Sequence, residues 1–139
     1  MTTQLFFDLM ADPSNVPIHF CEAKEIDDIE SQLREKDVAV IRIDGSSIRD
    51  RNDLYRAFAL ALRKPKGWYG DEEYAPNADA FLEYLDDARE WIPAAGRIVV
   101  ITDSEKFWRD QSRLAGFLVE MWQFAMHRRD AKLHLIFAW

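Results

Sequence analysis

The side chains best suited to chemistry gather in one stretch, from Lys66 to Asp87. Two aromatic residues, Trp68 and Tyr69, stand between two glycines, which indicates a loop. Trp and Tyr carry much of the energy at the centres of protein interfaces, although loop aromatics also fold back onto cores. Three acids follow the second glycine, and carboxylates attract cationic partners. The acids are Asp71, Glu72 and Glu73.

A helix is predicted to follow this loop and to carry more acids. Asn77 is a favourable N-cap, and Pro76 before it disfavours helical backbone one residue earlier. Apolar residues at helical spacing predict a buried stripe, formed by Ala78, Phe81, Leu82, Leu85 and Ala88. Acids at the same spacing form a second stripe beside it, made of Asp79, Glu83, Asp86 and Glu90.

The acidic stripe is mildly unfavourable in the isolated chain. Like charges four residues apart on a helix cost about 0.2–0.5 kcal/mol per pair. Two interpretations follow: an acidic face that only contacts water, or a negative surface that meets a positive partner. The second interpretation would be wrong if the chain's own Arg and Lys neutralised these acids while the rings of Trp68 and Tyr69 lay inside the protein.

The same stretch resembles the barstar family, whose members bind and block small ribonucleases. The similar residues are Tyr69-Gly70, Asn77, Asp79, Ala80 and Phe81, with Leu85 beyond them. The resemblance covers about residues 38–139 and implies an inhibitor whose loop and helix plug a ribonuclease active site. The resemblance, the glycine-flanked aromatic pair and the acidic run together predict these partner-binding residues: Trp68, Tyr69, Asp71, Glu72, Glu73, Asn77, Asp79, Leu82 and Glu83.

This sequence also departs from the barstar pattern. Extra residues, about Asp71 to Pro76, lengthen the loop and make it more acidic. Glu83 stands where the family has its central inhibitory aspartate, and Leu82 stands where an interface tryptophan often occurs. Neither Gln123 nor Phe124 is a carboxylate, although the resemblance places an acid at about this point of the last helix. These differences suggest a different ribonuclease, or a partner that is not a ribonuclease.

Composition narrows the class of protein. The chain has 139 residues, 48% hydrophobic and 31% charged, which suits one globular domain. A net charge of −7 argues against direct nucleic-acid binding and favours a basic protein partner. The single cysteine, Cys21, fits a reducing compartment, and no apolar run is long enough to span a membrane. The N-terminus lacks the features of a signal peptide, so a cytoplasmic location is expected. A monomer is expected rather than an oligomer.

The order of predicted elements indicates an α/β fold. Strands are expected at about residues 16–20, 38–45, 97–103 and 133–137, with helices between them. Helical crossovers imply parallel strands, so we predict a small parallel sheet of three to four strands, barstar-like in class. Residues 1–139 are expected to form one domain, in which 1–37 are an N-terminal β-α extension of a core at 38–139.

No catalytic, metal or cofactor constellation is evident in the sequence. Phosphate-binding, nucleophile-elbow and zinc motifs are all absent. Asp44 and Asp103 each end a predicted strand, where α/β proteins place ligands, so a small metal-dependent enzyme is the alternative. Such acids also serve ordinary turns. We therefore expect a non-enzyme, either an inhibitor with an immunity or antitoxin role or an interaction module with a non-nuclease partner.

Overall fold

A parallel sheet forms the centre of the protein. The computed structural model describes residues 17–67, 74–128 and 133–139. Within these residues, four strands lie in the order β1-β4-β3-β2, and all neighbours are parallel. The strands are β1 (Ile18–Cys21), β2 (Val38–Asp44), β3 (Gly96–Thr102) and β4 (His134–Ala138). The predicted α/β class and parallel sheet are confirmed.

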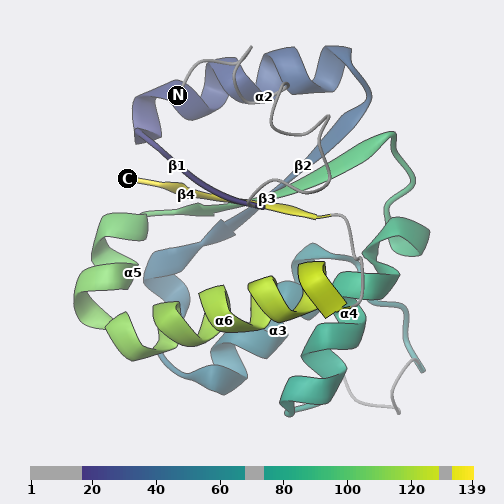
Figure 1. Cartoon of the computed structure of the whole chain (residues 1–139), viewed down its shortest axis with the longest axis vertical. Helices are drawn as coiled ribbons and strands as arrows, with labels where there is room; N and C mark the ends of the chain where they lie inside the picture. Colours follow the sequence, from purple (N-terminus) through teal and green to yellow (C-terminus); the bar gives the residue numbers. More distant parts are fainter. Residues whose placement is uncertain (1–16, 68–73, 129–132) are drawn as a thin grey trace.

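Helices cover the two faces of this sheet unequally (Figure 1). One face carries α2 (Ile26–Glu35), which a 3₁₀ turn, η1 (Ala23–Glu25), connects to β1. The other face carries the remaining described helices, and a second 3₁₀ turn, η2 (Gly45–Ser47), follows β2. Those helices are α3 (Arg51–Ala61), α4 (Ala78–Trp91), α5 (Ser104–Asp110) and α6 (Ser112–Arg128).

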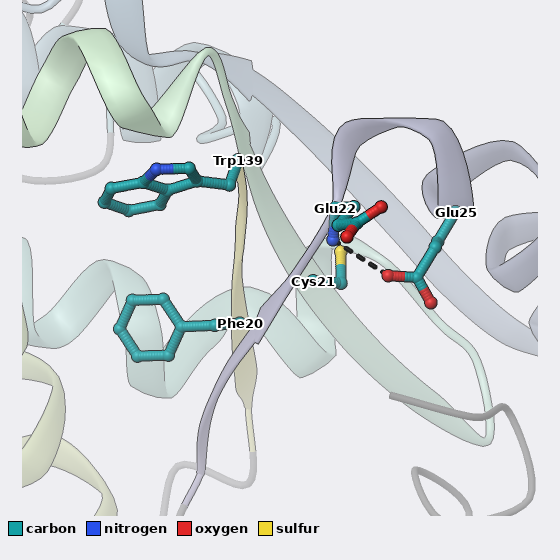
Figure 2. A pocket seen from close by; sticks show the side chains of 5 residues that line it. All are labelled: Phe20, Cys21, Glu22, Glu25 and Trp139. Carbon is teal, nitrogen blue, oxygen red and sulfur yellow. Dashed lines mark hydrogen bonds between the residues drawn. The ribbon is translucent and has the colours of Figure 1, made fainter.

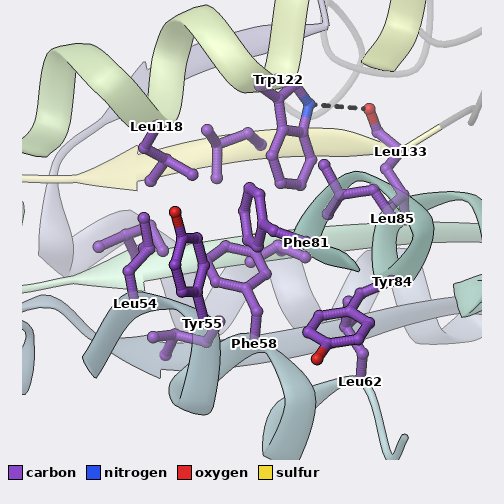
Figure 3. Close-up of a cluster of buried hydrophobic side chains, with 14 of the residues drawn as sticks. Leu54, Tyr55, Phe58, Leu62, Phe81, Tyr84, Leu85, Leu118, Trp122 and Leu133 are labelled. Carbon is purple, nitrogen blue, oxygen red and sulfur yellow. Dashed lines mark hydrogen bonds between the residues drawn. The ribbon is translucent and has the colours of Figure 1, made fainter. Parts of the chain in front are cut away.

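The core lies mainly on the face that carries α3 to α6. Strand β3 is central, and residues Ile98 to Ile101 are all buried, as their β-branched sequence predicts. Aromatic rings fill the space between this strand and the helices (Figure 3). Trp122 is fully buried, and its indole N–H donates to the carbonyl oxygen of Leu133 at 3.2 Å. This bond satisfies the one polar atom of a large apolar side chain.

The element boundaries differ from the predicted ones in a few places. The first strand begins at Ile18, because Pro17 lacks an N–H and suits the edge position that β1 occupies. The sequence from Ala23 to Lys36 predicts one helix, but its first three residues form the turn η1, and α2 follows and ends at Glu35. The sequence predicts a short helix from Ser104 to Trp108 and a longer one from about Gln111 to Arg128. In the structure, α5 extends to Asp110 and α6 begins at Ser112. An amphipathic stretch expected at residues 4–10 lies outside the described residues.

The N-terminal β-α unit is continuous with the rest of the sheet. Strand β1 pairs with β4 along its length, with Ile18 opposite Leu135 and Cys21 opposite Ala138. Helix α2 packs beside β2, where the buried Glu30 forms ion pairs with Arg34 and Arg42. Residues 17–37 therefore extend the sheet by one edge strand and cover one of its faces.

Candidate partner-binding surface

The N-terminus of α4 is fixed by an asparagine cap. The side-chain oxygen of Asn77 accepts the backbone N–H of Ala80 at 2.8 Å, which satisfies one of the free N–H groups of the first turn. Asn77 itself has extended backbone, and its N–H donates to the carbonyl of Ala75 at 3.0 Å. The side chain expected to contact a partner thus also sets where the acidic helix begins.

A buried tyrosine joins the helix to the residues before it. The hydroxyl of Tyr84 accepts the backbone N–H of Ala75 at 2.7 Å, and the Tyr84 side chain is fully buried. This contact holds the chain that enters α4 against the helix itself. Tyr84 is not among the site residues predicted from the sequence. Its position three residues after Phe81 places it on the buried stripe, and a buried hydroxyl requires a hydrogen-bonding partner.

The apolar side of α4 anchors the helix in the core. Phe81, Leu85 and Ala88 are fully buried, and the Phe81 ring meets the ring of Phe58 edge-on with centroids 5.0 Å apart. Leu82 is only 6% exposed and belongs to the same cluster. Leu82 was expected to contact a partner, but this burial leaves it little surface to offer. Because the helix is so packed, the carboxylates on its other side are held on a rigid support.

The acidic side of α4 faces solvent. Asp79 and Glu83 are both exposed, and they lie four residues apart, on one side of the helix. Asp79 lies in the first turn, where the helix dipole favours an anion. Glu83 has an acid four residues away in each direction, Asp79 before it and Asp87 after it.

In the described part of the chain, the ion pairs involve acids of other elements than α4. The ion pairs in the described part of the chain join Arg34 and Arg42 to acids of α2, Lys24 to Glu22, and Arg109 to Asp110. Within these same residues, neither Asp79 nor Glu83 has a cation at ion-pair distance. The described cations therefore do not neutralise these two carboxylates.

The rest of the expected surface lies outside the described residues. This applies to Trp68, Tyr69, Asp71, Glu72 and Glu73, so their roles stay predictions. Tyr74, the next residue along the chain, is half-buried, and the guanidinium of Arg56 lies 5.1 Å from the centre of its ring. This cation–π contact fixes the chain to α3 shortly before α4 begins.

The comparison with known families agrees with this geometry. Residues 38–137 match the family described as Barstar (barnase inhibitor). The chain belongs to the barstar family. The resemblance drawn from the loop and helix is thereby confirmed, and the barstar match runs from the first residue of β2 into β4. Strand β1 and helix α2 precede the matched region. A comparison with curated proteins finds no match.

Barstar is an inhibitor family, which fits the expectation of a non-enzyme. The two acids of the enzyme alternative occupy N-cap positions, Asp44 before η2 and Asp103 before α5. The Asp44 carboxylate accepts hydrogen bonds from the backbone N–H and the hydroxyl of Ser46, at 2.9 and 2.7 Å. Asp103 has left-handed backbone, with φ 52°, which suits a turn. In the described residues, no cluster of three or more His, Cys, Asp or Glu could hold a metal ion. None of the described helices has the length and apolar composition that crossing a membrane requires.

Proposed function

We propose that this barstar-family chain inhibits a small basic ribonuclease, and that it binds through α4 and the loop before it. The observation that carries the proposal is the pair Asp79 and Glu83. Both are exposed on a rigid helix, and neither has an ion-pair partner among the described residues. The family description, barnase inhibitor, supports the same class of partner.

The chemistry of a ribonuclease explains why carboxylates suit this task. An enzyme that binds phosphodiesters needs Lys, Arg or His in its cleft, and these groups attract any anion of suitable spacing. Neighbouring acids on one side of a helix have Cβ atoms about 5–6 Å apart, close to the spacing of successive phosphates on one strand. Asp79 and Glu83 would therefore take the place of substrate phosphates. The same charges would speed association and make it weaken with salt.

An inhibitor of this kind protects the cell that makes the ribonuclease. We therefore propose an immunity or antitoxin role in the cytoplasm, with the protein acting as a monomer. Association would be fast because the partner and this chain, at −7, carry opposite charge.

An inhibition assay tests the proposal. Purified chain is added to a panel of small basic ribonucleases, with acidic ribonucleases as controls, and RNA cleavage is followed at low and high salt. We expect stoichiometric inhibition of at least one basic enzyme, reduced by salt and by inorganic phosphate that competes for the same cleft. Inhibition that ignores both salt and phosphate would contradict binding at a cationic active site.

A second candidate is an interaction module whose basic partner is not a nuclease. The burial of Leu82 favours it, since this position offers no aromatic anchor to a ribonuclease, and so do the extra acidic residues of the preceding loop. This candidate predicts salt-dependent binding of a basic protein without any effect on RNA cleavage. The panel therefore separates the two: inhibition of any member supports the first candidate.

A further inference from the structure

The segment that leads into α4, residues 74–77, is held by contacts from both α3 and α4. The guanidinium of Arg56, on α3, lies 5.1 Å from the centre of the Tyr74 ring. The hydroxyl of Tyr84, on α4, accepts the Ala75 N–H at 2.7 Å. The N–H at position 77 donates to the carbonyl of Ala75 at 3.0 Å. The entry into the acidic helix is therefore tied to two helices that pack against each other.

These anchors differ in how far they depend on the core. Tyr84 is fully buried, so its hydrogen bond belongs to the packed interior. Arg56 is exposed and Tyr74 is half-buried, so the contact between them lies at the surface. A guanidinium over an aromatic face at an exposed site changes an equilibrium constant about two- to fivefold. Loss of Arg56 should therefore loosen the start of the segment and leave the core intact.

Arg56 also brings a positive charge to an acidic part of the protein. Among the described residues it belongs to none of the ion pairs, and its guanidinium lies over the Tyr74 ring instead. The exposed charged residues in the first two turns of α4 are Asp79 and Glu83, both negative. A cation beside such a surface reduces the attraction that the surface exerts on a cationic partner.

We propose that Arg56 is a positioning residue for the partner-binding surface, and that it slows both the association and the dissociation of a basic partner. The inference rests on the proposed function, in which α4 and the loop before it meet a cationic cleft. During approach, the charge of Arg56 opposes a basic protein, because charges at the edge of an interface act mainly on the association rate.

In the complex, the contact of Arg56 with Tyr74 acts in the other direction. It holds residues 74–77 in one arrangement before the partner arrives, so less conformational freedom is lost on binding. Gains in affinity of this kind appear mostly as slower dissociation. Arg56 thus opposes association through its charge and opposes dissociation through its contact with the ring.

Two substitutions separate the charge of Arg56 from its stacking. A guanidinium is planar and stacks on an aromatic face, whereas the ammonium of lysine keeps the charge and makes a weaker contact with the ring. Arg56→Lys therefore preserves the charge and part of the contact, and Arg56→Gln removes both. The matched control is Arg113→Gln, the same change at an exposed position near the end of α6 that connects to α5, away from α4 (Figure 1).

The kinetic test uses the full chain and the basic ribonuclease that it inhibits most strongly, with association and dissociation rates measured separately. Arg56→Gln should raise the association rate constant at low salt, and less so at high salt. It should also raise the dissociation rate constant about two- to fivefold. Arg56→Lys should leave association unchanged and raise dissociation less, and Arg113→Gln should leave dissociation unchanged.

Hydrogen exchange gives a readout that needs no partner. Exchange at the Ala75 N–H, next to Tyr74, should become faster in Arg56→Gln and should change less in Arg56→Lys. Exchange at the buried Val100 in β3 should not change, which shows that the variants keep their fold.

Three results would overturn the inference. One is a dissociation rate that is the same in Arg56→Gln and Arg113→Gln, and another is Ala75 exchange that Arg56→Gln leaves unchanged. The third is an Arg56→Lys variant that dissociates as fast as Arg56→Gln, since the cation over the ring would then play no part. If no basic ribonuclease is inhibited, the proposed function fails, and Ala75 exchange alone decides whether Arg56 positions this segment.

Discussion

Replacing Glu83 by lysine should stabilise the isolated protein while it weakens the proposed function. Glu83 is exposed in the middle of α4, with Asp79 four residues before it and Asp87 four residues after it. A lysine at this position would meet an acid in both directions. The change exchanges two unfavourable pairs for two favourable ones, and it disturbs no described core contact.

The size of the gain follows from the two pairs. Removing one like-charge pair at this spacing gains about 0.2–0.5 kcal/mol, and forming an opposite-charge pair gains about the same. The two pairs together should therefore raise the free energy of unfolding by about 0.8–2 kcal/mol at low salt. We expect the lower half of that range, because Asp87 is half-buried and has other contacts. For a domain of this size, about 1 kcal/mol raises Tm by roughly 2–4 °C.

Urea unfolding of wild type and Glu83→Lys at low and high salt measures the change. The matched control is Glu120→Lys on α6, an exposed position with the same change in charge and no charged residue three or four positions away. We expect Glu83→Lys to raise the free energy of unfolding, Glu120→Lys to leave it nearly unchanged, and salt to reduce the difference. Equal effects of the two substitutions would refute the reasoning, because the gain would then come from net charge alone.

Three further substitutions test the structure. Burial lowers the pKa of His19 from 6.5 to about 4, so the stabilising contribution of the neutral ring should be fully present above pH 6.5. The free energy of unfolding should fall by up to about 3 kcal/mol as pH drops to 4. His19→Leu should reduce this pH dependence in urea unfolding. Tyr84→Phe removes the acceptor for the Ala75 N–H and should lower the free energy of unfolding by about 1 kcal/mol. Hydrogen exchange at the Ala75 amide should become faster, and an unchanged exchange rate would contradict the contact. Gly45→Ala would place a methyl group 2.7 Å from the backbone oxygen of Thr102, so thermal unfolding should show a stability loss of about 1–3 kcal/mol. A variant as stable as wild type would contradict this close backbone packing.

Much of the fold was predictable because its signals are local. The run from Ile98 to Ile101 is β-branched throughout and forms the buried central strand, and Asn77 caps the helix at the expected residue. Pro17, which has no backbone N–H, directly precedes the edge strand β1, as proline in a strand segment predicts. These features depend on backbone preferences within a few residues, which the sequence displays directly.

Contacts between distant residues could not be predicted in this way. His19 and His134 are 115 residues apart, yet the pairing of β1 with β4 brings their ring nitrogens to 3.1 Å. The contact between the rings of Phe20 and Trp139, with centroids 6.2 Å apart, arises from the same pairing (Figure 2). Strand order is set by the packing of whole elements, so no pattern near either residue indicates its neighbour.

The candidate surface was predictable in part. Periodicity placed Asp79 and Glu83 on the exposed side of a helix, where the structure also has them. The same periodicity put Leu82 on the buried stripe, whereas its assignment to a partner came from the resemblance. Burial followed the stripe, because an apolar side chain at that spacing gains more from the core than from solvent.

We propose that Asp79 and Glu83 bind a cationic ribonuclease cleft. The most direct test measures inhibition by a chain with Asp79→Asn and Glu83→Gln, against the basic ribonuclease that the wild type inhibits most strongly. The matched control, Glu35→Gln with Glu105→Gln, removes the same charge from exposed positions on α2 and α5. We predict that the Asp79→Asn, Glu83→Gln variant loses roughly a hundredfold or more in affinity. This magnitude is the one known for close charged pairs at protein interfaces, including those of barstar complexes. The control should inhibit like wild type, and equal inhibition by both variants would contradict the account.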